Sequence, residues 1–442
     1  MALSKITADS LGANAVTANA ISNTAIIAAV GYTPANKAGD TFTGNVVFSA
    51  NATVTGVATF SNTTAHTGAA TFSNTVAIGS DYITPYTGFK NRIINGDMRI
   101  DQRNAGTLVN PMVDSTYYLD RFRASGTQTS KLSIGQNAGS VTPPAGFTNY
   151  MGFTSLSAYS ITSSDIFGIA QNIEGYNVAD FAWGTASASA VTLSFRVYSS
   201  LTGTFGGSLR NSAGSRSYPF SYSISAANTW TTISITIAGD TSGTWLITNG
   251  IGILLFFSLG SGSTYSGTAG SWSGSTYTSA TGATSVVGTS GATFYITGVQ
   301  LEKGSTATAF DYRSYGQELQ LCQRYFQTLS QQTCWGIATN SQAVISFIPP
   351  VVMRATPSLA IKGNGSYSST TVYYENAPWQ AVGSLTGAAA DAGHLTPQGG
   401  DINVNGTFSS LPVNAVGNVF NKKYPLNDNT TGQSYLTISA EL

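Results

Sequence analysis

Apolar and polar residues alternate along most of the well-patterned segments of this chain, which is the period of half-buried β-strands. The alternation is clean over 191–198 and 230–237, and it continues over 294–301 with a glycine, Gly298, that is typical of a β-bulge. Segment 251–257 is apolar on both faces, so we expect it to be a central strand. Turns rich in Gly, Ser and Asn separate these segments, which favours a β-sandwich or jelly roll.

One segment after these strands changes to the period of an α-helix. Its apolar positions recur at steps of three and four, at Leu319, Cys322, Tyr325, Phe326 and Leu329. We therefore predict an amphipathic helix over 314–330 that links two β domains. Its buried core should consist of Leu319, Cys322 and Phe326.

The pattern predicts an all-β fold with a central jelly-roll-like β-sandwich and one linking helix. Alternating segments at 343–348, 370–375 and 435–439 predict a further β domain near the C-terminus. The predicted regions are 1–35, an attachment segment; 36–80, a repetitive trimeric shaft; 81–89, a linker; 90–313, the β-sandwich; 314–330, the linking helix; and 331–442, the C-terminal β domain at the tip.

A short repeat precedes the predicted sandwich. Each Thr-Gly step is followed by a phenylalanine, and Phe48, Phe60 and Phe72 are spaced twelve residues apart. Such a unit cannot bury its apolar face alone, and it gains a core by stacking or association. We predict a homotrimeric shaft with these rings in layers around a threefold axis, since a monomeric β-solenoid would need more and longer turns. His66 is then an ion ligand on that axis or, more simply, a packing residue.

The first 35 residues place sparse Leu, Ile and Val among small residues. A segment of this kind has too little apolar surface for a core of its own. Two interpretations remain, a flexible terminal arm and an anchor that docks onto a larger particle. We expect the anchor.

Composition narrows the classes of function. Charged residues make up only 9% of the 442 residues, against ~25% in an average globular protein, and the formal net charge is zero. Without a basic tract, we expect no nucleic-acid partner. No apolar run has the length of a membrane span and no apolar signal core opens the chain, so we expect cytoplasmic assembly without membrane insertion. Cys322 and Cys334 are too few for a disulfide framework, which favours a buried free thiol at Cys322.

Candidate catalytic chemistry is sparse. A glycan depolymerase needs two carboxylates at a defined separation, and the chain has only 19 acidic residues, several of them in segments with a structural pattern. We expect Asp97–Arg99 and Asp120–Arg121 to be ion pairs that fix turns. The two His and two Cys lack metal-site spacing, and no Gly-rich phosphate loop is present. We therefore expect no enzymatic activity, no metal and no cofactor.

Two groups of aromatic residues are candidates for sugar binding, because a sugar stacks its C–H face on a ring and hydrogen-bonds through its hydroxyls. A long Gly- and Ser-rich loop, 260–282, carries the first group: Tyr265, Trp272 and Tyr277. Loops of this length are usually functional or disordered. The alternative is that these aromatics pin the loop to the sandwich. The second group lies in the C-terminal region and comprises Tyr373, Tyr374 and Trp379.

Three pieces of the chain resemble tail-fibre and receptor-binding proteins of tailed phages, and they occur in that family's order. The first two are Asn91–Arg103 and Tyr117–Phe122. The third runs from Thr297–Gly304 (TGVQLEKG) through Ala307–Phe310 and Glu318 to Cys322–Phe326.

The resemblance implies a β-sandwich similar to a carbohydrate-binding module. It also implies a virion protein that attaches to a phage tail or baseplate protein through its N-terminus and binds a host surface glycan or protein with its distal domains. Two alternatives stay open. One is a depolymerase tailspike that degrades host polysaccharide, and the other is a structural spacer whose tip contacts another virion protein.

The phenylalanine repeat predicts a trimer in solution. Static light scattering on the full-length protein should give the mass of three chains. Phe60→Ala should weaken the shaft, because each layer loses three rings and truncating a buried Phe costs about 3–5 kcal/mol in ordinary cores. A stable, soluble monomer with an ordered N-terminal region would contradict the trimer.

Overall fold

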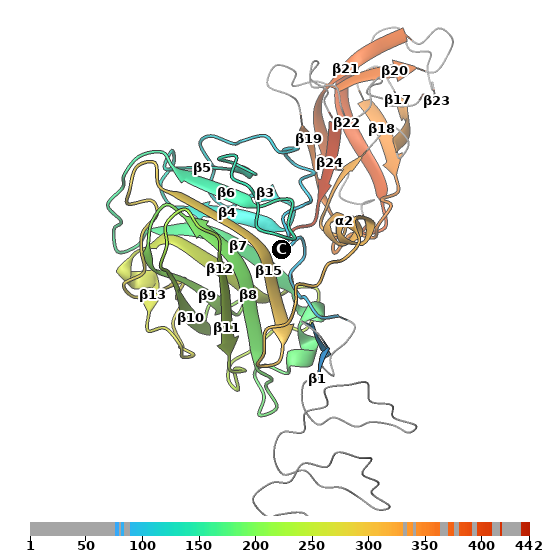
Figure 1. Ribbon diagram of the computed structural model, residues 1–442. Helices are drawn as coiled ribbons and strands as arrows, with labels where there is room; N and C mark the ends of the chain where they lie inside the picture. The colour runs from blue at the N-terminus through green and yellow to red at the C-terminus, as the bar shows by residue number, and fades with distance from the viewer. Residues whose placement is uncertain are drawn as a thin grey trace, which may run out of the picture. The chain divides into compact units, whose positions relative to one another are not determined.

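The computed structural model describes residues 89–329 without interruption (Figure 1). It also describes 76–78, 81–83, 334–338, 342–362, 370–374, 380–390, 396–408, 416–417 and 435–442. The chain divides into two compact units, Met1–Thr71 and Phe72–Leu442, and all described residues belong to the second. The predictions for the attachment segment, for Trp379 and for the shaft with Phe48, Phe60 and Phe72 therefore lie outside the described residues.

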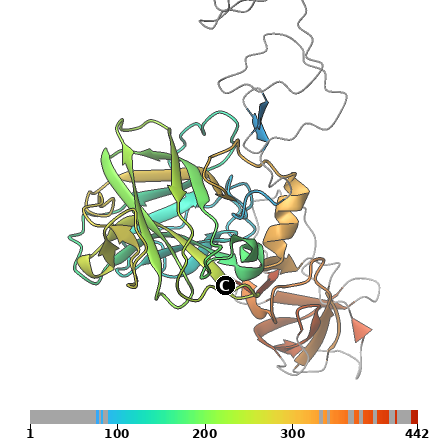
Figure 2. The same ribbon diagram turned by 90° about the horizontal axis from the view of Figure 1, so that it is seen from below.

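Two antiparallel sheets pack face to face as a sandwich (Figures 1 and 2). The six-stranded sheet has the order β10 (Ser217–Ile224), β9 (Gly203–Arg210), β12 (Ile251–Ser261), β7 (Ile166–Glu174), β4 (Phe122–Gly126) and β3 (Thr116–Leu119). The five-stranded sheet has the order β11 (Thr231–Ile237), β8 (Val191–Ser199), β15 (Thr293–Lys303), β6 (Met151–Ser155) and β5 (Leu132–Gln136). The predicted all-β fold with a central β-sandwich is confirmed.

Alternation along the strands builds the core between the sheets. The inward side chains of β8, such as Leu193 and Phe195, are completely buried, as their period predicts. Strand β12 lies between β9 and β7 and is buried on both faces, with Leu255 inside the core and Phe256 outside it. The predicted central position of this segment is therefore confirmed.

The predicted bulge in β15 is also present. The register between β15 and β8 shifts between Thr297 and Gln300. Gly298 has a φ of 61°, and a Cβ built there would lie 2.6 Å from the ring of Phe147. Both the left-handed backbone and the close ring require glycine at this position.

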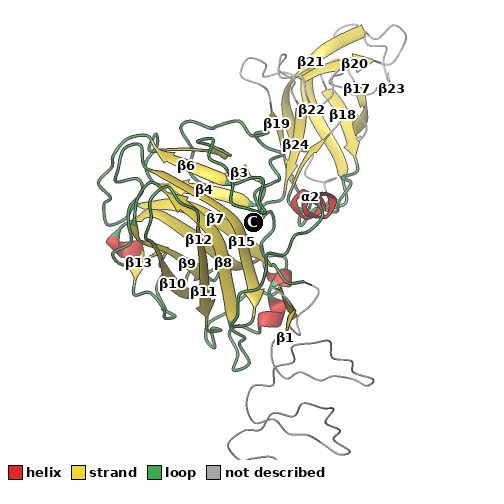
Figure 3. Cartoon of the chain, viewed as in Figure 1, coloured by secondary structure: helices red, strands yellow, loops and turns green. Residues whose placement is uncertain are grey.

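The linking helix is shorter than the sequence predicts. Helix α2 spans Tyr315–Gln323, with the Ser314 hydroxyl accepting a hydrogen bond from the Gln317 amide at its start (Figure 3). Cys322 is fully buried and Leu319 is half-buried, and both pack with Ile94 and Ile100 near the start of the sandwich.

Phe326 is buried as predicted, but the prediction that it belongs to the helix is wrong. The chain leaves the helix after Gln323, and Phe326 opens strand β16 (Phe326–Leu329). This segment pairs with β24 (Tyr435–Ser439), which is remote in sequence. The apolar spacing of the segment suits a helix, but a strand partner from the end of the chain supplies its backbone hydrogen bonds.

Short strands make up the rest of the described chain. A three-stranded sheet has the order β16, β24 and β19 (Ser358–Lys362). A six-stranded sheet has the order β20 (Thr370–Tyr374), β21 (Gln380–Ala390), β22 (Gly400–Phe408), β18 (Gln342–Phe347), β17 (Cys334–Ala338) and β23 (Val416–Gly417). Before the sandwich, β1 (Val76–Ile78) pairs with β2 (Asp81–Ile83). In the part of the chain that the structure describes, no helix is long and apolar enough to span a membrane.

Side-chain hydrogen bonds hold the start of the sandwich to its last strand. The Asn91 amide donates to the Val299 carbonyl (3.1 Å), and its oxygen accepts from the Ile93 and Leu301 amides. The Asn95 amide in turn donates to the carbonyls of Ile100 and Asp120. These asparagines satisfy buried backbone groups where the chain has no regular partner strand.

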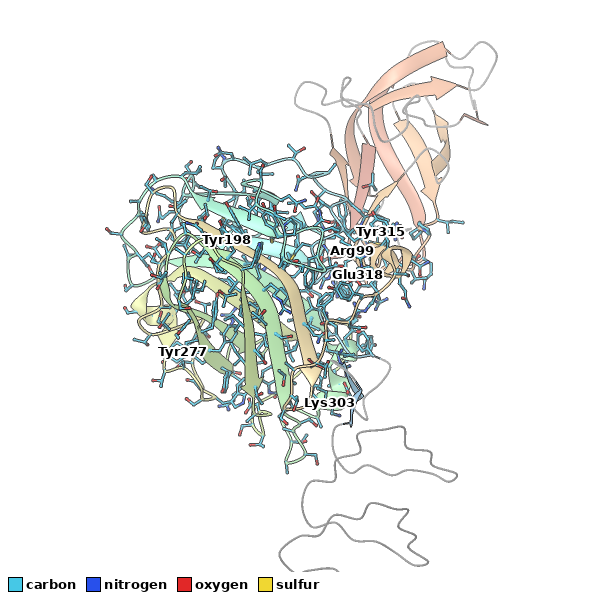
Figure 4. The ribbon with its side chains drawn as sticks, viewed as in Figure 1. Arg99, Tyr198, Tyr277, Lys303, Tyr315 and Glu318 are labelled. Atoms are coloured by element: carbon cyan, nitrogen blue, oxygen red, sulfur yellow. The ribbon has the colours of Figure 1, made fainter. Side chains whose placement is uncertain are left out.

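Glu318 connects helix α2 to the same region, and Figure 4 labels it. Its buried carboxylate accepts hydrogen bonds from Arg313 (3.2 Å) and from the Asn95 amide. Asp97 pairs with Arg99, which confirms the first predicted ion pair.

The second predicted ion pair, Asp120–Arg121, is wrong. Asp120 accepts from the Gln102 amide (2.7 Å) and from the Gln102 side chain (2.9 Å). Arg121, which adopts a φ of 70°, pairs instead with Glu441 near the end of the chain. Neighbours in a tight turn thus take different partners, one local and one remote.

Glu441 lies in a cluster of charged and aromatic side chains that we call the terminal joint. It accepts from Arg103 (2.7 Å) as well as from Arg121. Arg103 lies over the ring of Phe326 at 3.7 Å, and Arg121 lies over the ring of Tyr325 at 3.6 Å. The last residues of the chain are thereby bound to the β3–β4 turn of the sandwich.

Burial of Asp120 predicts a pH-dependent stability. Burial raises the pKa of Asp120 to about 7, against the opposing effects of the Arg103 charge and the Gln102 hydrogen bonds. The folded state then binds the proton more tightly than the unfolded state, so this group's contribution is full below about pH 4 and is lost as the pH rises through 7. Relative to Asp120→Asn, the wild type should lose at most about 1.4 kcal/mol per pH unit over this window. Urea unfolding of both proteins at pH 5, 6, 7 and 8 measures this, and a constant difference would contradict the raised pKa.

Candidate functional site

The loop after β12 positions the first predicted group of aromatics. It contains the short turn Ser263–Tyr265 and the strands β13 (Ser266–Gly267) and β14 (Ser279–Ala280). Within it, the Trp272 indole N–H donates to the Ala238 carbonyl (2.8 Å). The Trp272 ring makes edge-to-face contacts with the rings of Trp183, Tyr218 and Trp245. These contacts give Trp272 a packing role that pins the loop to the sandwich.

Tyr277 is also held by its neighbours. Its ring lies against Gly267, where a built Cβ would be 2.3 Å from a ring atom. Its amide donates to the Ser217 hydroxyl (3.3 Å). Figure 4 labels Tyr277 and Tyr198, which lie well apart on the sandwich.

Tyr265 differs from Trp272 in the contacts of its ring. Its carbonyl accepts from the Thr278 amide (2.8 Å), which fixes the backbone. The ring is half-buried, and within the described residues no hydrogen bond to its hydroxyl and no contact with another ring is formed. The hydroxyl of Tyr265 acts to raise the pKa of Arg210, against the effect of burial.

A row of residues crosses the outer face of the six-stranded sheet beside this loop. The strand registers place Arg123 of β4 opposite Ala170 of β7, Ala170 opposite Phe256 of β12, and Phe256 opposite Ser208 of β9. Arg210 lies two positions after Ser208 on the same strand and faces Leu254. Because side chains alternate between faces along each strand, all of these point away from the core.

The middle of this face is apolar. Ala170, Leu254 and Phe256 are at most 6% exposed and form their own small cluster with the half-buried Ile166 and Ile251. The long side chains of Arg123 and Arg210 lie on either side of this floor. The aliphatic stem of a guanidinium side chain covers apolar surface well and keeps its charge toward water. We call Arg123, Arg210, Tyr265 and this floor the arginine face.

Arg123 affects the pKa of Arg210 on this face. Burial lowers the pKa of Arg210, the nearby charge of Arg123 lowers it further, and Tyr265 acts in the opposite direction. Both Nε atoms are buried and, among the described residues, neither has a hydrogen-bond partner. No carboxylate in the described chain pairs with either residue, whereas the following arginines do form ion pairs: Arg92, Arg99, Arg103, Arg121, Arg216, Arg313 and Arg324. The face therefore offers unused donors to an incoming group.

The opposite face, on the five-stranded sheet, carries an aromatic row that the sequence reasoning missed. Tyr198 stacks with Tyr295 (ring centroids 5.2 Å apart), and Trp230 contacts both Tyr198 and Tyr150. The Trp230 indole N–H donates to the Thr142 carbonyl (2.9 Å). Tyr150 and Tyr295 are buried, so only Tyr198 and Trp230 keep some exposure. The alternation in β8 and β15 placed Tyr198 and Tyr295 on outer faces, but it gave no strand order that would bring them together.

The buried carboxylates of the described chain serve the fold. Asp165 accepts from the Thr127 hydroxyl, from Thr162 and from the Tyr159 hydroxyl. Burial raises the pKa of Asp165, but these hydrogen bonds outweigh it and lower the pKa below its usual range. The others also accept hydrogen bonds from the chain: Asp120, Glu174, Asp240, Glu302 and Glu318. Within the described residues, no group of three or more His, Cys, Asp or Glu side chains could hold a metal ion.

The second predicted aromatic group cannot be built into a site. Tyr373 and Tyr374 end strand β20, opposite Ala381 and Gln380 of β21. Their side chains and Trp379 lie outside what the structure describes.

No family model and no curated protein sequence matches the chain. Solved structures with a similar fold include the enzymatically active domain of tailspike protein 4 of bacteriophage CBA120, at 12% identity and a TM-score of 0.27, covering 48% of this chain and 21% of that one. A family 11 carbohydrate-binding module from Clostridium thermocellum has 12% identity and a TM-score of 0.22, covering 45% and 97%. The N-terminal modules of an endo-1,4-beta-D-xylanase from Clostridium thermocellum, complexed with xylohexaose, have 15% identity and a TM-score of 0.22, covering 50% and 29%.

These likenesses concern part of the chain, and the matched part is about a fifth (21%) of the tailspike chain. With identities of 11 to 15% and TM-scores from 0.22 to 0.28, they carry no argument about a ligand. What the sandwich binds must be argued from its own side chains.

The contacts of the loop aromatics predict opposite effects of two truncations. Trp272→Ala should lower the free energy of unfolding by on the order of 3 kcal/mol, because it removes a ring that packs on three others. Tyr265→Ala should change it by less than about 0.5 kcal/mol, since its ring makes no contact with another ring and its hydroxyl no hydrogen bond among the described residues. Urea unfolding of the full-length protein compares the two, and equal losses would show that Tyr265 also pins the loop.

Proposed function

We propose that this chain is a tail-fibre protein of a tailed phage, and that its β-sandwich binds a glycan of the host cell surface without cleaving it. The observation that supports the binding step is the arginine face, which presents two guanidinium groups without ion-pair partners and the free ring of Tyr265. Sugars are bound by combining ring stacking with a few well-placed hydrogen-bond donors. A rigid sheet with a packed apolar floor holds both kinds of group in place.

The virion role rests on the sequence. The twelve-residue phenylalanine repeat has the pattern of a trimeric shaft, and the three motif pieces follow the order found in tail fibres. Small residues with sparse apolar positions at 1–35 suit docking onto a tail or baseplate protein. A trimer would present three sandwiches, and several trimers on one particle raise avidity by about 10²–10⁴. Weak binding at each sandwich is then sufficient for adsorption.

The absence of cleavage is part of the proposal. The buried carboxylates described above are engaged in hydrogen bonds that fix turns and strand ends. Glu174, which lies opposite Ile251 of the floor, is bound by Arg324 and Tyr325. A depolymerase would need two carboxylates about 5–10 Å apart across a sugar. The engagement of these carboxylates supports binding without cleavage over the depolymerase alternative.

Adsorption of the full-length protein to host cells tests the proposal. Tyr265→Ala should weaken binding to cells, and to their extracted surface polysaccharide, about tenfold, which corresponds to a loss of roughly 1.4 kcal/mol. Tyr198→Ala, on the opposite face, should leave binding unchanged at a temperature where both variants are folded. The reverse pattern would move the site to the aromatic row. New reducing ends released from the polysaccharide over time would show a depolymerase instead.

A further inference from the structure

We propose that the arginine face selects an acidic glycan, with a sugar-borne oxyanion held between Arg123 and Arg210 and the neighbouring sugar ring against Tyr265. This inference rests on the proposed glycan binding and adds the chemical class of the ligand. It is argued from the arrangement of charges on the outer face of the six-stranded sheet.

The two positive charges lie on the same sheet. Arg123 lies on β4 and Arg210 on β9, and strands β7 and β12 separate them. The strand registers place both side chains on the same outer face of the sheet, and the charge of Arg123 makes the protonated form of Arg210 less favourable. The two guanidinium groups therefore flank the apolar floor of Ala170, Leu254 and Phe256.

The chain does not neutralise this pair. Several other arginines in the described residues have acidic partners. Arg216 and Asp240 form two hydrogen bonds of 2.8 and 2.7 Å, and Arg324 binds Glu174 in the same way. Arg123 and Arg210 form no ion pair in the described chain, and their Nε atoms are buried there without a hydrogen-bond partner, as are those of the ion-paired Arg92 and Arg103. Two like charges that are partly desolvated and unpaired are unfavourable for stability.

A bound anion would relieve the repulsion between Arg123 and Arg210. A carboxylate or phosphate accepts two parallel hydrogen bonds from one guanidinium, and an anion placed between two arginines is attracted to both. A neutral sugar offers only hydroxyl acceptors and leaves the repulsion in place. The arrangement therefore favours an anionic group over a neutral one of the same shape.

Tyr265 accounts for the sugar part of the ligand. Its ring is half-buried with no ring partner among the described residues, and its hydroxyl acts to raise the pKa of Arg210. A sugar ring that stacks on Tyr265 would carry its acidic substituent toward Arg210. A free inorganic anion would use the arginines but gain nothing from this ring.

Isothermal titration calorimetry on the full-length protein, with tri-galacturonate as the probe, tests the inference. Galactotriose of the same linkage, which is the carboxyl-reduced form, is the matched neutral probe. Glucose 6-phosphate and inorganic phosphate are the third and fourth probes, and they separate a carboxylate from a phosphate preference and a sugar from a bare anion. An acidic sugar should bind more tightly than its neutral counterpart, and the difference should shrink from 50 to 500 mM NaCl.

Arg123→Gln and Arg210→Gln should each weaken binding of the acidic probe about 10- to 100-fold, the range expected for losing one charged hydrogen-bonding partner. Arg196→Gln is the matched control. Arg196 is a half-buried arginine on the outer face of the five-stranded sheet and forms no ion pair in the described chain. It should bind the acidic probe like the wild type.

Thermal melting gives a readout that a structural role would not predict. Removing one of two mutually repelling charges should keep or raise the melting temperature of Arg210→Gln while binding is lost. A fall in both would show that Arg210 serves the fold. Equal affinity for the acidic and neutral probes, or no binding of any acidic probe at 10 mM, would overturn acid selection.

The two proposals can fail separately. If Arg123→Gln and Arg210→Gln adsorb to host cells as the wild type does while Tyr265→Ala does not, glycan binding stands and acid selection is wrong. If none of the three variants changes adsorption, the arginine face is not the receptor site.

Discussion

The Arg121 guanidinium, which is 1% exposed, pairs with Glu441 and lies over the ring of Tyr325. A buried charge of this kind is tolerated only when a partner of opposite charge meets it, and removing the partner typically costs about 3–5 kcal/mol. Arg121 sits in the β3–β4 turn, Tyr325 follows helix α2, and Glu441 is next to the last residue of the chain. One buried cation thus requires three remote segments to meet. The Glu174 carboxylate supports them by accepting from the Tyr325 hydroxyl (2.6 Å) and from Arg324.

The pieces that carry the tail-fibre resemblance supply side chains that hold the start of the sandwich to its last strand, to helix α2 and to the end of the chain. Asn91 and Asn95 come from the first piece, Arg121 from the second, and Glu318 with Tyr325 from the third. Their side chains bind backbone groups, ion-pair partners and one another. The residues that carry the resemblance therefore close the sandwich and attach helix α2 to it. The resemblance says little about the ligand, because Arg210, Phe256 and Tyr265 lie outside those pieces.

The alternation of apolar and polar residues was enough to predict features that depend only on residues close in sequence, such as strands and their buried side chains. Leu193 and Phe195 alternate with polar residues and are buried, and Gly298 marks the bulge. The end of helix α2 could not be predicted in this way, because Phe326 takes its strand partner, Ser439, from the far end of the chain. For the same reason the arginine face was missed. Alternation places Arg123 and Arg210 on outer faces, but only the strand order β9, β12, β7 and β4 brings them to the same one.

The polar groups on the two outer faces of the sandwich have different partners. On the five-stranded sheet, the Trp230 indole and the Tyr150 hydroxyl both donate to backbone carbonyls, and the rings pack on one another. On the six-stranded sheet, the guanidinium groups of Arg123 and Arg210 keep unused donors beside a packed floor. A carboxylate at position 170 or 208 would lie between the charges of Arg123 and Arg210. The chain has the small residues Ala170 and Ser208 at these positions instead. Stability alone would favour a partner at such a position, so leaving it unfilled suits a partner that arrives from outside.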